Sequence, residues 1–108
     1  MKIYNPIISQ IVFDPVNLLS FENYQHQERI VKESLDLFGE WISIVHSKDF
    51  KVEMADKRLK QVRTGQGDFK YGPLIQWLEA HKPGISILLE EASETKAEEC
   101  IAYLKAVD

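Results

Sequence analysis

The feature that most constrains the fold is an alternation of short apolar, β-branched runs with segments of helical periodicity. The runs cover residues 9–13, 42–45 and 85–89. Each is almost continuously apolar, as expected for a strand that is covered on both faces. Strands that alternate with helical segments are typical of parallel sheets. The sequence therefore predicts an α/β fold with parallel strands.

A helical segment follows each run, which gives the order β-α-β-α-β-α in one domain over residues 1–108. The last helix is expected at residues 95–106, and a charged connector ending in the Gly-rich "TGQGD" leads to the second. No strand is expected directly before this loop, so it is not interpreted as a phosphate-binding fingerprint. The apolar positions that define the first two helices are Ile30, Val31, Leu35 and Phe38, then Leu74, Ile75, Trp77 and Leu78.

Length and composition limit the classes of function. With 108 residues, 44% hydrophobic and 28% charged, the chain is predicted to form one small globular domain. A net charge of -4 provides no overall field for nucleic acid or an anionic membrane. A single cysteine, Cys100, and the lack of a membrane-spanning run or signal-peptide pattern predict a cytoplasmic protein.

Polar residues with metal-binding chemistry stand at the end of each predicted strand. They are Asp14, His46 and Glu90. The carboxyl ends of parallel strands meet at one edge of a sheet, where α/β proteins bind ligands. An imidazole with two carboxylates suits Mn²⁺, Mg²⁺, Co²⁺ or Zn²⁺. The alternative is that strand ends simply meet solvent and carry polar residues for that reason.

Four motifs in a fixed order suggest a family. The segments "IVFDPVNLL", "IVHSKDF", "TGQGDFKY" and "ILLEE" together resemble the last three βα units of the xylose isomerase-like TIM barrels. That superfamily contains sugar phosphate isomerases and epimerases as well as endonuclease IV-type enzymes that cut DNA at abasic sites. The resemblance implies a partial (β/α)₈ barrel from a metal-dependent sugar or sugar phosphate isomerase or epimerase.

The same resemblance implies roles for the strand-end residues. Asp14, His46 and Glu90 correspond to three of the family's four metal ligands, and the fourth would lie upstream of Met1 with about five further βα units. The cation stabilises an enediolate while flanking carboxylates move a proton between adjacent carbons. Glu90 is therefore expected to be both a ligand and one catalytic carboxylate. The isolated chain would lack the other carboxylate.

Four further residues are candidates near this site. Asn17 stands where relatives often carry His, so it can hydrogen-bond a sugar hydroxyl but cannot act as a base. Lys48 and Arg63 are either ligands for a substrate hydroxyl or phosphate, or ordinary solvated cations. Asp49 is expected to orient either the following loop or His46.

Two other interpretations remain. An abasic-site nuclease would need further zinc ligands near "KRLKQVR", where Leu59 and Gln61 occupy the positions at which Asp and His would be required. The other is a truncated, non-catalytic remnant that self-associates, most simply as a homodimer. It would do so because the barrel-facing residues of an open sheet are left uncovered. Those residues are Val12, Ile42, Ile44 and Leu88, with the aromatic Phe13 nearby.

Overall fold

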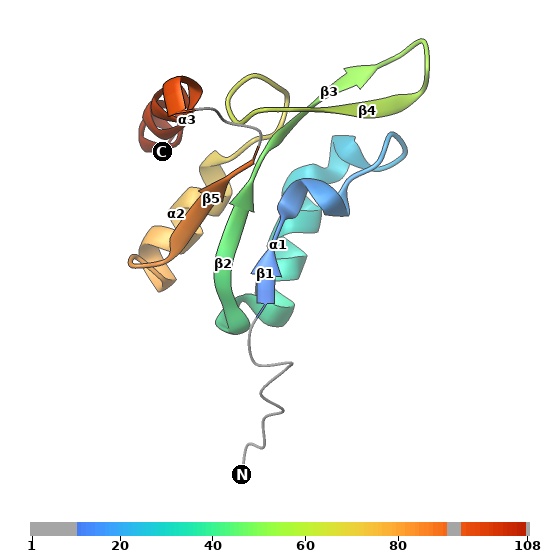
Figure 1. The fold of residues 1–108 in the computed structure, drawn as a ribbon. Coiled ribbons are helices and arrows are strands. Elements are labelled where there is room, and N and C mark those ends of the chain that lie inside the picture. The colour runs from blue at the N-terminus through green and yellow to red at the C-terminus, as the bar shows by residue number, and fades with distance from the viewer. Residues whose placement is uncertain (1–10, 91–93, 108) are drawn as a thin grey trace.

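The computed structural model describes residues 11–90 and 94–107, and it contains a three-stranded parallel sheet with the strand order β1-β2-β5. The strands are β1 (Ile11–Phe13), β2 (Ile42–Ser47) and β5 (Ser86–Leu89) (Figure 1). The predicted α/β class with parallel strands is confirmed. Residues 9 and 10 of the first predicted strand lie outside the described part of the chain.

The register of the sheet separates two faces. Phe13 pairs with Val45, which pairs with Ile87, and these side chains point toward the helices. One residue further along, His46 pairs with Leu88. Because side chains alternate along a strand, His46 and Leu88 lie on the opposite face.

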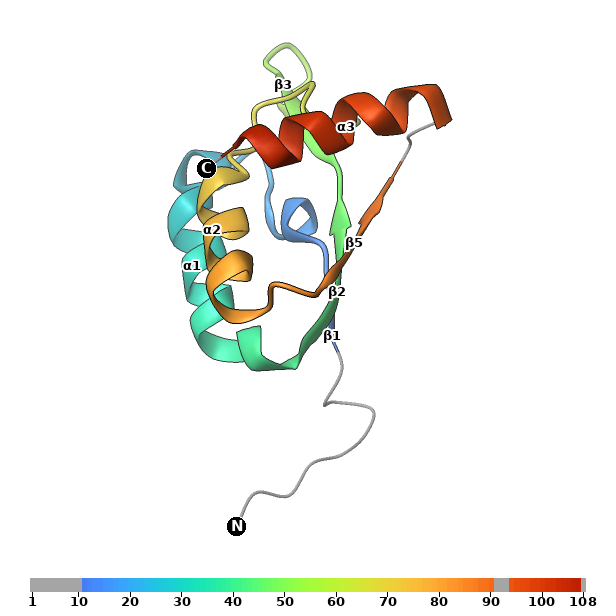
Figure 2. The ribbon, with the colours of Figure 1, turned by 90° about the vertical axis from the view of Figure 1, so that its left-hand side faces the viewer.

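Two helices, α1 (Gln27–Phe38) and α2 (Gly72–His81), cover one face of the sheet (Figure 2). Their apolar positions contribute the centre of the core, as their periodicity predicts. Gly39 ends α1, and a Cβ atom there would come within 2.5 Å of the Trp77 ring on α2. Glycine is therefore required for the close approach of the two helices. Within the described ranges, three 3₁₀ turns complete this layer: η1 (Pro15–Leu18), η2 (Tyr24–His26) and η3 (Gly39–Trp41).

The other face of the sheet is covered by no helix among the described residues (Figure 2). Val12 is 54% exposed and Leu88 49% exposed, while Ile44 is half-buried. The expectation was wrong for Ile42 and Phe13, which are 2% and 3% exposed and belong to the core. Parallel sheets normally have both faces covered, so this open apolar face is unusual.

An antiparallel hairpin, which the sequence analysis did not predict, follows β2. Its strands are β3 (Asp49–Glu53) and β4 (Arg58–Val62) (Figure 1). The predicted charged connector is thus a second, two-stranded sheet. β4 ends only two residues before Thr64, so the expectation of no strand before the Gly-rich loop was also wrong.

The last helix, α3 (Glu94–Ala106), begins one residue before its predicted start. Cys100 on this helix is 1% exposed, and burial raises the pKa of its thiol. Cys100 is therefore a packing residue of the helix. None of the helices in the described ranges is long and apolar enough to cross a bilayer.

Candidate metal centre

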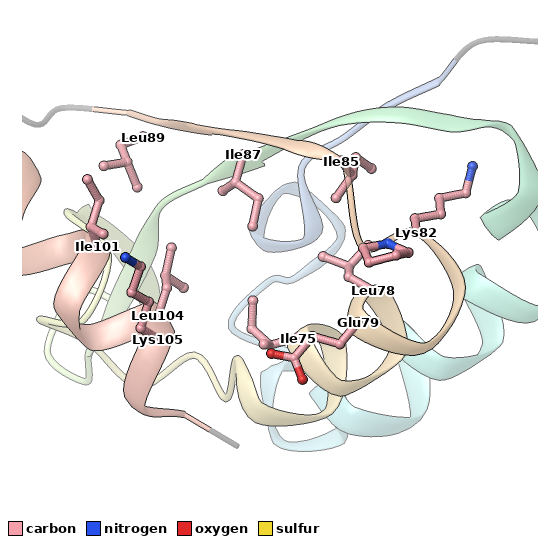
Figure 3. A pocket seen from close by; sticks show the side chains of 11 residues that line it. Ile75, Leu78, Glu79, Lys82, Ile85, Ile87, Leu89, Ile101, Leu104 and Lys105 are labelled. Atoms are coloured by element: carbon pink, nitrogen blue, oxygen red, sulfur yellow. The ribbon is translucent and has the colours of Figure 1, made fainter.

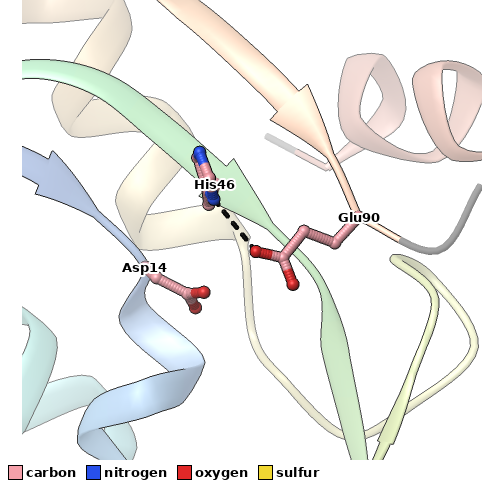
Figure 4. Close-up of side chains that lie close together, drawn as sticks. All are labelled: Asp14, His46 and Glu90. Atoms are coloured by element: carbon pink, nitrogen blue, oxygen red, sulfur yellow. Dashed lines mark hydrogen bonds and ion pairs between the residues drawn. The ribbon is translucent and has the colours of Figure 1, made fainter.

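The three predicted metal ligands lie together at the carboxyl ends of three adjacent strands. Asp14 directly follows β1, His46 is in β2, and Glu90 directly follows β5 (Figure 4). Each contributes one candidate ligand atom, and these atoms all lie within 4.8 Å of one another. One cation could therefore contact all three groups without a large movement of the backbone.

The backbone places the two carboxylates in this position. A residue before proline is disfavoured in the helical region, and Asp14, which precedes Pro15, is accordingly extended with φ -117° and ψ 92°. The strand conformation therefore continues through Asp14 before the chain turns into η1. At the other edge the backbone N–H of Glu90 donates to the Ser47 carbonyl at 2.9 Å, which continues the pairing of β5 with β2.

A hydrogen bond of 2.9 Å joins Nδ1 of His46 to Oε1 of Glu90 (Figure 4). An ionised carboxylate can only accept, so this bond requires the proton to be on Nδ1. In the neutral ring Nε2 is then unprotonated. A carboxylate that orients an imidazole in this way is common in metal sites.

Lys48 occupies the centre of the cluster. Its Nζ donates to Oδ1 of Asn17 at 2.6 Å and forms ion pairs at 3.1 Å with Oδ2 of Asp14 and 3.8 Å with Oε2 of Glu90. The Lys48 side chain is only 9% exposed. Among the four further candidates, the structure thus brings Asn17 and Lys48 to the metal ligands.

The backbone of Lys48 is held by a buried tyrosine, Tyr71. The Lys48 N–H donates to the Tyr71 hydroxyl oxygen at 3.0 Å, and that hydroxyl donates to the Lys48 carbonyl at 2.6 Å. Tyr71 is 1% exposed, and burial raises its pKa well above the ordinary value, so it remains a phenol and can donate. Tyr71 therefore holds the chain at the point where β2 leaves the sheet.

Asp49 holds the Gly-rich loop in place and does not orient His46. Its carboxylate accepts the backbone N–H groups of Phe50 at 2.9 Å, Phe69 at 2.8 Å and Gly65 at 3.0 Å. Burial raises the pKa of Asp49, and the three N–H groups oppose that rise. The loop therefore folds around an internal carboxylate.

Arg63 lies apart from the cluster. It follows β4 and forms an ion pair of 3.8 Å with Glu99 on α3. No hydrogen bond or ion pair within the described ranges joins Arg63 to Asp14, His46 or Glu90.

Sequence reasoning did not identify two contacts that position the site. Ser47 and Thr64 are both buried and share a 2.5 Å hydrogen bond, which ties the end of β2 to the Gly-rich loop. Gln27, at the start of α1, donates to the Asp68 carbonyl and accepts the Lys70 N–H. These residues are common polar types without a distinctive spacing. No sequence signal marked them.

An apolar cavity of about 320 Å³ lies between α2, β5 and α3 (Figure 3). It opens on the helix-covered side of β5, whereas the candidate metal centre is on the other side. Its wall offers few groups for chemistry, because apolar side chains dominate it: Ile75, Leu78, Ile85, Ile87, Ile101 and Leu104. The polar cluster is therefore the stronger candidate site.

Comparisons with protein families, curated proteins and solved structures gave no match to this chain.

Proposed function

We propose that the chain is the C-terminal portion of a divalent-metal-dependent sugar or sugar phosphate isomerase or epimerase. One observation carries the proposal: Asp14, His46 and Glu90 offer ligand atoms within 4.8 Å of one another at the ends of adjacent parallel strands. Two carboxylates and an imidazole suit Mn²⁺, Mg²⁺, Co²⁺ or Zn²⁺. The order of the four motifs then favours the xylose isomerase-like barrels over other metal proteins.

The chemistry of Asp14 supports a cation. Its Oδ1 atom is buried and has no hydrogen-bond partner within the described part of the chain, although Oδ2 contacts Lys48. A buried acceptor without a partner costs about 1–3 kcal/mol, and more when it is charged. A cation bound by Asp14, His46 and Glu90 would remove that cost.

A bound cation would polarise a substrate carbonyl and stabilise the charge that forms when a proton leaves the neighbouring carbon. The residues of this chain would then hold and move groups around it. Glu90 would hold His46 in position through Oε1, and it is the carboxylate proposed to move the proton. Asn17 is exposed next to Asp14 and would hydrogen-bond a sugar hydroxyl.

The proposed barrel origin also explains the open face of the sheet. In a closed barrel the face that carries His46 and Leu88 would be the interior, filled by side chains from other strands. Its exposed Val12 and Leu88 would there be buried. The complete enzyme would need the remaining strands and a second carboxylate, so the isolated chain is proposed to be inactive.

Calorimetric titration with Mn²⁺ tests the metal site. Wild type is expected to bind, and His46→Ala is expected to bind at least tenfold more weakly because one ligand is lost. His81→Ala is the matched control, since His81 stacks on Trp77 at the end of α2 and is exposed. Equal binding by wild type and His46→Ala would exclude His46 from the site.

The open face supports a second candidate function, a non-catalytic remnant that self-associates as a homodimer. A partner copy would cover Val12, Ile44 and Leu88 and the outer edges of β1 and β5, which pair with no other strand of the described residues. Burying about 400 Å² of apolar surface provides about 10 kcal/mol, and association costs about 4–15 kcal/mol. Light scattering behind a sizing column tests this proposal. A folded species of 12.5 kDa at all concentrations would refute self-association.

The abasic-site nuclease is the weaker enzyme candidate. Leu59 and Gln61 lie on β4 of the hairpin, where that activity would require further zinc ligands. We therefore expect no cleavage of abasic DNA with Zn²⁺ or Mn²⁺.

A further inference from the structure

We infer that Lys48 is a built-in competitor of the divalent cation, and that metal binding must displace its ammonium from Asp14 and Glu90. This inference rests on the proposed function and specifies how the occupancy of that site is controlled. Its basis is the position of the Lys48 Nζ between the two carboxylates, 3.1 Å from Asp14 Oδ2 and 3.8 Å from Glu90 Oε2.

The ammonium of Lys48 is held by one hydrogen bond and two ion pairs. Besides the two carboxylates, Nζ donates to Oδ1 of Asn17 at 2.6 Å. A lysine ammonium has three donors and no acceptor, and every partner of Nζ within the described residues belongs to the cluster. The same carboxylates are the oxygen ligands that a divalent cation would require. A cation and the ammonium therefore compete for the same negative charge.

The position of the ammonium is built into the fold. The Lys48 side chain is 9% exposed, and both backbone polar groups of Lys48 bond to the hydroxyl of buried Tyr71. Lys51, the next lysine, provides a contrast: it is exposed on β3 and pairs across the hairpin with another lysine, Lys60. Lys48 is thus a fixed internal counter-charge rather than a mobile surface cation.

Charge repulsion predicts how removal of the Lys48 charge changes the affinity for a divalent cation. Two cations near each other in a partly buried site repel more strongly than in water, because the effective dielectric constant is lower. Removing one partner of a buried ion pair also leaves the other charge uncompensated. A site without the Lys48 charge should therefore bind a divalent cation more tightly, since the cation replaces the missing positive charge.

The test compares Mn²⁺ binding by wild type, Lys48→Gln and the control Lys51→Gln at constant ionic strength. Lys48→Gln is expected to bind at least tenfold more tightly than wild type, and Lys51→Gln to bind like wild type. Suppose that wild type binds Mn²⁺ and His46→Ala binds it at least tenfold more weakly. Equal or weaker binding by folded Lys48→Gln than by wild type would then refute this inference and leave the metal site intact. Absence of binding by all four proteins would refute both proposals.

A second measurement uses wild type alone and so does not depend on the folding of a variant. Acetic anhydride is applied with and without saturating Mn²⁺, and acetylation of each lysine is measured by mass spectrometry. Displacement predicts a several-fold increase in acetylation of Lys48 with Mn²⁺ and no change at Lys51. Unchanged or reduced acetylation of Lys48 would show that the ammonium stays in place, and would overturn the inference.

Discussion

Replacing Asp49 by Asn should destabilise the fold, because the Gly-rich loop depends on this carboxylate. Asp49 is fully buried and accepts three backbone N–H groups. Oδ1 accepts from Phe50 and Phe69, and an amide oxygen could replace it. Oδ2 accepts from Gly65, and in Asp49→Asn an NH₂ group would face that N–H instead. One partly buried donor would then lose its partner.

The expected loss of stability in Asp49→Asn follows from these contacts. A hydrogen bond to a charged group contributes about 1.5–3 kcal/mol, and an unsatisfied buried donor costs about 1–3 kcal/mol. Removing a buried charge offsets part of this loss. We expect Asp49→Asn to reduce the free energy of unfolding by about 2–4 kcal/mol, a large part of the 5–15 kcal/mol typical of small domains.

Urea unfolding followed by tryptophan fluorescence measures this difference by linear extrapolation. Asp36→Asn is the matched control, because Asp36 is exposed on α1 and its replacement should change stability by less than about 0.5 kcal/mol. If Asp49→Asn is as stable as Asp36→Asn, the carboxylate does not hold the loop and the reasoning is wrong.

The pH dependence of the stability difference between wild type and Asp49→Asn tests whether burial or hydrogen bonding dominates the pKa of Asp49. Burial raises the pKa of Asp49 in the folded protein, which means that the fold favours the protonated form. The stability that this shift contributes is fully present below the unfolded pKa of about 3.9 and is lost as pH rises through the folded pKa. The advantage of wild type over Asp49→Asn should therefore decrease from about pH 4 upward. An advantage that grows with pH would show that the three N–H groups outweigh burial.

Two further outcomes are expected. A Cβ at Gly67 would come within 2.5 Å of Asp49 Oδ1 and closer still to the Phe50 carbonyl. Gly67→Ala should therefore lower the free energy of unfolding in urea by at least about 3 kcal/mol. Gly72→Ala should leave it unchanged, because a Cβ there has nothing within 4 Å. The chain with Mn²⁺ should show no substantial turnover of a ketose or ketose phosphate, and turnover that disappears in Glu90→Gln would indicate that self-association had rebuilt a site.

Periodicity was sufficient to predict the parallel strands and the helices, because their apolar positions face a common core. Val31 and Leu35 on α1, and Leu74 and Leu78 on α2, are buried at the predicted spacing. The placement of Asp14 at the end of its strand could also be anticipated, since parallel strands bring their carboxyl ends to one edge of the sheet.

The hairpin was missed because its strands are rich in charged residues and its turn lacks an Asn-Gly or Asp-Gly signal. The turn instead places Lys57 at φ 51°, a conformation that is uncommon for residues other than glycine. A weak signal was present in the alternation of Phe50 and Val52 with charged residues, and Val52 does pair with Leu59.

The details of the site were beyond sequence reasoning. Asp49 binds backbone groups up to 20 residues away, and the Lys48 ammonium bonds to Asn17 31 positions earlier. Such contacts depend on how the loops close in space. Neither the spacing nor the types of these residues predict such contacts.

The polar cluster also has an electrical consequence. With His46 neutral, the carboxylates of Asp14 and Glu90 and the ammonium of Lys48 leave one net negative charge at the strand ends. A bound divalent cation would neutralise the two carboxylates, and the displaced Lys48 ammonium would remain as one net positive charge beside them. The empty cluster would thus attract cations and repel anions, whereas the loaded cluster would attract an oxyanion. An anionic ligand should consequently follow the metal into the site and should strengthen its retention there.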